Sequence, residues 1–259
     1  MAFNKPFRRN YRPNLNCSDE RYIKDPDYAL LPPEHYIRAF LLIQSDMKKM
    51  FEYIEPSKES LKTYSYRIHE LLLRTCIEVE ANFKAIFKDN TFSTDEKKWN
   101  ISYYKKINIT HHLDDYTVKI PIWAGSDRTF TPFADWKDKT ENSLFWYKAY
   151  NESKHDRQKN FKQANFKNLV NAIAGLFVLL SSQFRFEDFA PPAPSISRTA
   201  DQYIVPSTGI GNFFIIEFPH DWKDEEKYDF NWIELEKEDK RFEKINYDTI
   251  LTNKIQDST

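Results

Sequence analysis

The sequence has few cysteines, no long apolar run and almost no net charge, and each absence excludes a class of protein. Among its 259 residues are two cysteines, Cys17 and Cys76, which rules out a disulfide framework and a cysteine-based zinc site. The longest apolar run, Ala172 to Leu180, is far shorter than the roughly 20 residues that a membrane-spanning helix needs. No apolar segment follows the basic amino terminus, so we expect a cytoplasmic protein with no secretory signal and no membrane partner.

Charge is balanced over the whole chain but unevenly distributed along it. The formal net charge is -1, so total charge indicates neither a nucleic-acid nor a membrane partner. Between Lys137 and Lys167, however, eight basic residues accompany four acidic ones. From Asp221 onward, twelve acidic residues accompany seven basic ones. We therefore expect a basic surface near the middle of the chain and an acidic tail.

Apolar residues that recur every three or four positions predict four helices. Their ranges are about 34–54, 57–89, 140–157 (with Thr140 as its cap) and 163–184. Gly175 lies in the middle of the last helix and predicts a close crossing with a neighbouring helix. Strand-like residues at 108–113 and 116–123 predict a β-hairpin, and those at 203–205 and 211–218 predict two further strands. The expected fold class is mainly α: a four-helix bundle with an inserted β-hairpin and a C-terminal β-containing extension.

Composition divides the chain into four expected regions. Residues 1-30 are rich in Asn, Arg and Pro, which favours a flexible basic arm. Residues 31-187 contain the helical bundle, with the hairpin insertion at about 90-140. Residues 188-200 form a proline-rich linker, and residues 201-259 form a small acidic tail that contains the predicted strands.

The end of the third predicted helix is the chemically densest part of the sequence. Asn151, Lys154 and His155 stand at helical spacing, so one face presents an amide, an ammonium and an imidazole. Histidine can move a proton near neutral pH, lysine can neutralise a phosphate oxygen and asparagine can orient a hydroxyl, which together suit a phosphodiester. Arg157 points about 100° away and joins this face only if the helix ends or kinks. A solvated helix terminus, where cations meet the negative end of the dipole, accounts for the same residues.

Two other groups of residues offer weaker chemistry. The pairs His111-His112 and Asp114-Asp115 contain metal-ligand types, but neighbours in a strand point to opposite faces, so a solvated turn is favoured. We expect no metal and no cofactor. The aromatic residues between positions 99 and 136 could stack nucleobases, but a small aromatic core beneath the hairpin is the favoured interpretation.

Three segments of the sequence resemble the HEPN superfamily of bacterial and archaeal helical-bundle proteins over about residues 34 to 186. They read RIHELLLRTCIEVEANFKAIF, KAYNESKHDR and QANFKNLVNAIAGLF. The superfamily motif is an arginine, four to six residues and then a histidine, with a polar residue directly after the arginine. His155 matches the histidine and Asn151 matches the polar residue. The arginine position falls on Tyr150 or Lys148, and neither is an arginine.

Many HEPN proteins are metal-independent ribonucleases of toxin and antiviral defence systems, and the resemblance implies the same activity here. The 2′-hydroxyl of RNA would attack the adjacent phosphate with His155 as acid or base. Lys154, Arg157 or Lys148 would stabilise the developing charge. The resemblance also implies a homodimer in which two copies of the third helix face each other, and an antitoxin or other regulatory protein partner.

Further residues complete the expected site. Lys148, Tyr150 and Tyr147 are the expected substrate contacts, and Glu78 and Glu80 on the second helix are candidates to orient His155. For both glutamates an ordinary surface or packing role remains the stronger alternative. The alternative function is a catalytically inactive HEPN-like module that binds single-stranded RNA or a protein partner, and the missing arginine favours it.

Overall fold

The computed structural model describes residues 2–16, 19–126, 128–138, 140, 143–189 and 209–250, in which the chain is mainly helical. The α-helices are α1 (Pro33–Met50), α2 (Tyr66–Asp89), α3 (Ile101–His111), α4 (Phe145–His155), α5 (Arg157–Asn160), α6 (Phe166–Phe184) and α7 (Trp232–Leu235). These helices confirm the predicted mainly α fold class. No helix in these ranges combines the length and the apolar character needed to cross a membrane.

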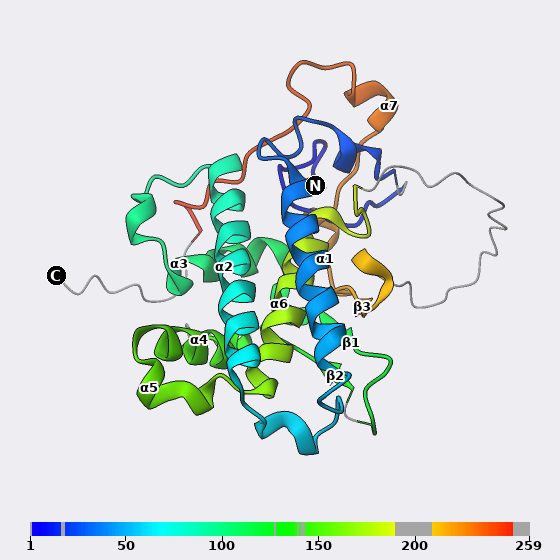
Figure 1. Ribbon diagram of the computed structural model, residues 1–259. Helices are drawn as coiled ribbons and strands as arrows, with labels where there is room; N and C mark the ends of the chain where they lie inside the picture. The colour runs from blue at the N-terminus through cyan, green and yellow to red at the C-terminus, as the bar shows by residue number, and fades with distance from the viewer. Residues whose placement is uncertain are drawn as a thin grey trace, which may run out of the picture.

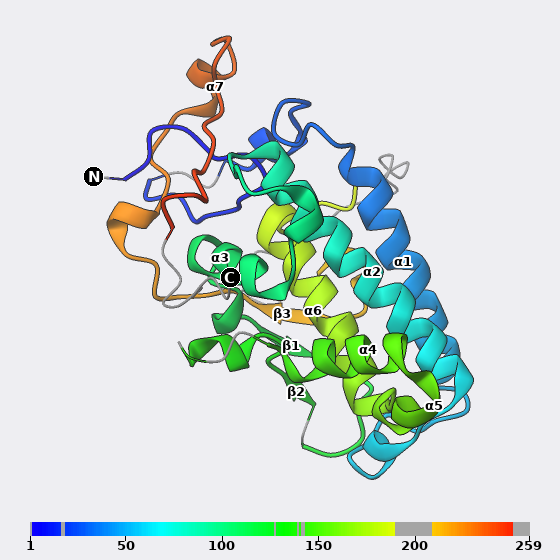
Figure 2. The same cartoon turned by 90° about the vertical axis from the view of Figure 1, so that its left-hand side faces the viewer.

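Helix α6 lies at the centre of the fold. Every residue from Phe166 to Phe184 except Lys167 is buried. The helix packs against α1, α2 and α4, which lie next to it in both views (Figures 1 and 2). Such a helix, apolar on nearly all sides, can form in water only when neighbours cover it.

Helix boundaries differ from the predicted ones where polar side chains cap the backbone. The second helix begins at Tyr66 rather than 57, because Ser65 is extended and its side chain accepts the amide of Ile68 at 3.2 Å. The last helix begins at Phe166, with Asn165 as its cap. The predicted cap at Thr140 is wrong, because that residue bonds to Asp138 and the helix begins only at Phe145.

The predicted hairpin is half wrong. Residues 108–111 belong to helix α3, which Asn100 caps and His112 ends in a left-handed conformation at φ 51°. Beyond it, strand β1 (Thr117–Lys119) pairs antiparallel with both β2 (Thr129–Phe130) and β3 (Ile215–Glu217), and the strand order is β2-β1-β3. Strand β3, which comes from the carboxy-terminal part of the chain, therefore joins the sheet of the insertion. The strand predicted at 203–205 and most of the linker lie outside the described residues.

Gly175 marks a close crossing, as predicted. A Cβ atom at this position would lie 3.0 Å from Cζ2 of Trp146 on α4 and 3.5 Å from Cβ of Pro132. The indole nitrogen of Trp146 donates to the carbonyl oxygen of Pro132 at 2.7 Å. The absence of a side chain on α6 thus lets α4 lie directly against it, which sets the position of the candidate site.

The amino-terminal segment is not a flexible arm. Phe7, Arg9, Asn10 and Arg12 are all buried, and the segment forms isolated β-bridges with the tail at Tyr228 and at position 243. Figure 1 shows the first residues and the chain around α7 side by side at one end of the helices. The described parts of the expected arm and tail therefore pack together with the helices.

Arg9 joins this segment to three helix ends. Its Nε donates to the Asp89 carboxylate at the end of α2 at 2.5 Å, and Nη1 donates to Gln183 near the end of α6 at 3.0 Å. Nη2 donates to the carbonyl oxygen of Leu31, just before α1. The side chains of Arg9 and Asp89 are 0% and 2% exposed, so the pair is fully removed from water.

Removing one partner of this ion pair is expected to destabilise the fold. Asp89→Ala leaves the Arg9 charge buried without its counter-ion, which costs about 3–5 kcal/mol in the free energy of unfolding. The matched control is Asp46→Ala, which removes the surface pairs with Arg74 and Lys49 and should cost at most about 1 kcal/mol. Urea denaturation of both variants measures the difference, and equal losses would contradict the role given to Arg9.

Candidate functional site

The predicted site lies at the end of α4, which the structure places beside the first half of α2 (Figure 2). Helix α4 stops at His155 because Asp156 leaves the helical conformation, with φ -139° and ψ 81°. The Asp156 side chain then caps α5 by accepting the amide of Lys159 at 3.1 Å. The helix thus ends before Arg157, which is the condition under which the sequence predicted that Arg157 could join the site.

The candidate residues divide into an exposed and a buried set. Lys148, Lys154, His155 and Arg157 are exposed, and Asn151 is half-buried beside them. Tyr147 and Tyr150 are buried, so they are part of the packing between helices rather than of the exposed face.

The buried tyrosines converge on a carboxylate of α2. The Tyr147 hydroxyl donates to Oε1 of Glu80 at 2.9 Å, and Lys154 Nζ donates to the Tyr150 hydroxyl at 3.0 Å. Burial first, and the charge of Glu80 second, raise the pKa of both tyrosines above the ordinary value. Both therefore remain neutral phenols, and Tyr150 lies between the half-buried Glu80 carboxylate and the exposed ammonium of Lys154.

Neither glutamate of α2 orients His155 within this chain. Among the described residues, no hydrogen bond or ion pair joins His155 to Glu78 or Glu80. Glu80 instead contacts the tyrosines of α4. Glu78 is half-buried, and its burial raises the pKa of its carboxyl group. The imidazole of His155 thus lies in solvent between Lys154 and the bend at Asp156.

Arg157 brings aromatic residues into the site that the sequence alone did not indicate. Its guanidinium lies 5.7 Å from the ring centre of Tyr66, the first residue of α2. The Tyr66 ring in turn lies 4.7 Å from that of Phe161, just after α5. The sequence signal was the pair of tyrosines around the capping Ser65, but their proximity to Phe161 depends on helix packing.

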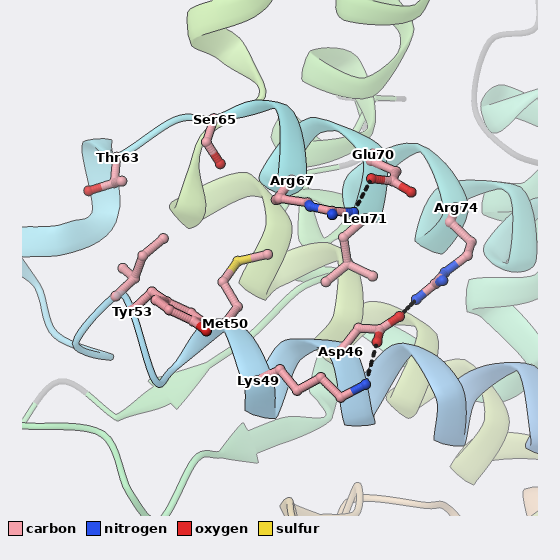
Figure 3. A pocket seen from close by; sticks show the side chains of 11 residues that line it. Asp46, Lys49, Met50, Tyr53, Thr63, Ser65, Arg67, Glu70, Leu71 and Arg74 are labelled. Carbon is pink, nitrogen blue, oxygen red and sulfur yellow. Dashed lines mark hydrogen bonds and ion pairs between the residues drawn. The ribbon is translucent and has the colours of Figure 1, made fainter.

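A groove of about 640 Å³ lies between the end of α1 and the start of α2. Figure 3 shows Arg74 and Lys49 both directed at Asp46, and Arg67 directed at Glu70. The Arg74–Asp46 pair joins α2 to α1, whereas each of the other two pairs lies within one helix. None of the predicted site residues lines it.

The histidine pair at 111–112 separates into two environments. His111 is buried, and its Nε2 lies 2.8 Å from the carbonyl oxygen of Arg9, to which it donates. Burial lowers the pKa of His111 to about 3, so the ring is neutral and anchors the amino-terminal segment. Half-buried His112 has a ring nitrogen within 4.8 Å of Asp115 and Asp221 oxygens, a group whose residue types can ligate metal.

Lys137 already supplies a positive charge to that group. Its ammonium lies 2.9 Å from Oδ1 of Asp115, and this hydrogen bond raises the pKa of Lys137.

The aromatic residues of the insertion are buried and form a core, as the favoured interpretation of the sequence predicts. They are Trp123, Phe130, Phe133 and Trp136.

No protein-family model, curated protein or solved structure matches this chain. The interpretation of the site therefore depends on the chemistry of its own residues.

The buried state of His111 makes stability depend on pH. The unfolded chain binds a proton below about pH 6.5, whereas folded His111 does so only near pH 3. The contribution of neutral His111 to the free energy of unfolding is therefore complete above about pH 6.5. It falls by up to about 1.4 kcal/mol per pH unit as the pH drops toward 3. Urea titrations at a series of pH values measure the slope. His111→Gln should reduce the slope of the free energy of unfolding against pH, whereas His35→Gln, at an exposed position, should not. Equal slopes in the unmodified protein and both variants would contradict the role given to buried His111.

Proposed function

We propose that the chain is a metal-independent endoribonuclease of the HEPN type that acts on single-stranded RNA. The packing of α1, α2 and α4 around α6 is consistent with the four-helix bundle that this assignment requires. The observation that carries the proposal is the exposed imidazole of His155, which ends α4 directly after the exposed Lys154 and two residues before the exposed Arg157. A proton-transfer group with a cation on either side in the sequence suits a phosphodiester backbone.

The reaction is an internal transesterification. The 2′-hydroxyl oxygen of one nucleotide forms a bond to the adjacent phosphorus, and the bond from phosphorus to the 5′-oxygen of the next nucleotide breaks. The products are a 2′,3′-cyclic phosphate and a 5′-hydroxyl. His155 accepts the proton from the 2′-hydroxyl or delivers one to the 5′-oxygen, and a second copy of the chain in a homodimer supplies the other proton-transfer group.

Lys154 is the proposed substitute for the arginine of the motif. The arginine position with four intervening residues is Tyr150, whose hydroxyl accepts a hydrogen bond from Lys154 Nζ at 3.0 Å. The cation is thus held next to the side chain that replaces the arginine. A lysine neutralises a phosphate oxygen as a point charge, without the two-pronged contact of a guanidinium. Arg157, with its guanidinium over Tyr66, supplies the fork-shaped cation.

His155→Ala is expected to reduce cleavage of a single-stranded RNA by roughly 100-fold or more, because it removes the proton-transfer group. Its RNA affinity should change little, since the neighbouring cations remain. The matched control is His35→Ala, an exposed histidine on α1 that should leave cleavage unchanged. Undiminished cleavage by the His155 variant, measured on denaturing gels with chelator present, would overturn the assignment.

A binding module that does not cleave is the second candidate, and Tyr150 is the observation that favours it. The tyrosine is fully buried and uncharged, so the motif cation is absent from its own position. The same assay separates the candidates. If the unmodified protein binds RNA but does not cleave it, whether it is monomeric or dimeric, the result would favour the binding module.

Both candidates require that cations of α4 and α5 contact phosphates. Lys154→Gln and Arg157→Gln are each expected to reduce the slope of log affinity against log salt by about 0.7, because one fewer counterion is released from the single strand. The control is Lys244→Gln, an exposed lysine in the acidic tail. Fluorescence anisotropy at several salt concentrations gives the slopes, and unchanged slopes for both site variants would exclude this face as the phosphate contact.

A further inference from the structure

Three aromatic rings form a cluster on the surface next to Arg157. The ring of Phe161 lies 4.7 Å from that of Tyr66 and 5.7 Å from that of Tyr64, nearly perpendicular to the latter at 87°. The two tyrosines are 67% and 43% exposed. Large aromatic surface left in water is unfavourable unless a ligand or partner covers it.

The backbone under these rings is fixed on both sides. Ser65 caps α2 between the two tyrosines, and Tyr64 forms an antiparallel bridge with Asn165, the cap of α6. Alongside it, the amide of Phe166 donates to the carbonyl oxygen of Thr63 at 2.8 Å. Both tyrosines therefore stand where the start of α2 meets the start of α6, so their backbone is fixed and their spacing is preorganised.

A histidine lies directly behind the cluster. The ring of His69 meets that of Phe161 edge to face at 5.9 Å, and the residue is only 7% exposed. Its Nε2 is buried and has no hydrogen-bond partner among the described residues. Buried polar atoms without partners are rare in folded proteins and call for a specific explanation, such as a functional site.

The charges around the cluster suit a polyanion. Arg157, Lys159 and Lys162 come from the same short segment as Phe161, and all three are exposed. The nearest acid in that segment, Asp156, accepts the Lys159 amide as the cap of α5, so its carboxylate is engaged at the turn. Exposed aromatic rings bordered by cations are the combination that binds single-stranded nucleic acid.

We propose that Tyr66, supported by Tyr64 and Phe161, is a stacking platform for an unpaired nucleobase of the RNA bound at His155. This inference rests on the proposed function and deepens it by naming the surface that recognises an unpaired base of the substrate. A base can stack on Tyr66 only when it is free of its partner strand, whereas phosphate contacts alone would accept a duplex. Arg157 connects the two parts, since it follows His155 by two residues and its guanidinium lies 5.7 Å from the Tyr66 ring.

The test compares RNA affinity in two tyrosine variants of the full chain. Tyr66→Leu should weaken binding of a short unstructured RNA by about tenfold, because stacking on the ring is lost. Tyr66→Phe keeps the ring and should bind as tightly as the unmodified protein. Tyr53→Leu is the matched control, since this tyrosine is 86% exposed at the end of α1 and lies outside the cluster. All measurements use anisotropy in a His155→Ala background, so that the RNA stays intact.

Two further readouts separate stacking from charge. The salt slope of Tyr66→Leu should equal that of the background protein, because no cation is removed. The same RNA annealed into a duplex should bind the Tyr66→Leu variant and the background protein equally. Circular dichroism checks that the variant, changed at an exposed position, remains folded.

The outcomes distinguish this inference from the proposed function. If RNA binds and is cleaved but Tyr66→Leu binds as tightly as the background protein, the stacking platform is overturned and the ribonuclease proposal stands. Equal losses in Tyr66→Leu and Tyr66→Phe would also overturn it, since the ring would not be the contact. If the unmodified protein binds no RNA, both proposals fail together.

Discussion

The buried guanidinium of Arg9 connects segments that lie far apart in the sequence. It contacts Asp89 at the end of α2, Gln183 near the end of α6 and the carbonyl oxygen of Leu31 before α1. One planar side chain with five donors can match acceptors that approach from several directions. Because a buried charge is costly when a partner is missing, these three helix ends cannot shift independently of one another. The amino-terminal segment that carries Arg9 also bridges to the tail at Tyr228 and at position 243.

The candidate site follows from how α4 packs on that arrangement. Gly175 gives the Trp146 indole room on α6, and the buried tyrosines of α4 reach the Glu80 carboxylate on α2. These contacts fix the rotation of α4 and turn Lys154 and His155 outward. The proposed chemistry thus depends on a division of roles along one short helix, with neutral tyrosines facing inward and charged groups facing solvent. The Glu80 carboxylate lies next to Tyr150, whose hydroxyl accepts a hydrogen bond from Lys154, and within the described part of the chain no hydrogen bond joins it to His155.

Much of this could be predicted from local patterns. The periodicity of α1 and α6 was clear because each buries a continuous apolar stripe, and Gly175 indicated a crossing because glycine in a helix interior is unfavourable without a packing reason. The predicted start of the second helix was wrong because the capping bond of Ser65 competes with helical extension at positions 57 to 65. The strand expected at 108–113 was wrong because β-branched residues also form helices when tertiary packing favours them, as in α3.

The sequence by itself determined the helical class, the buried character of α6 and the group of Asn151, Lys154 and His155 on one helical face, since these follow from spacing along the chain. Only the tertiary structure decided that Arg157 turns toward Tyr66, that Phe161 joins two tyrosines separated from it by about a hundred positions, and that Arg9 lies in the interior. The physical reason is that local patterns record which side of an element avoids water. Which elements meet there depends on contacts between residues distant in sequence, and these form only when the whole core is assembled.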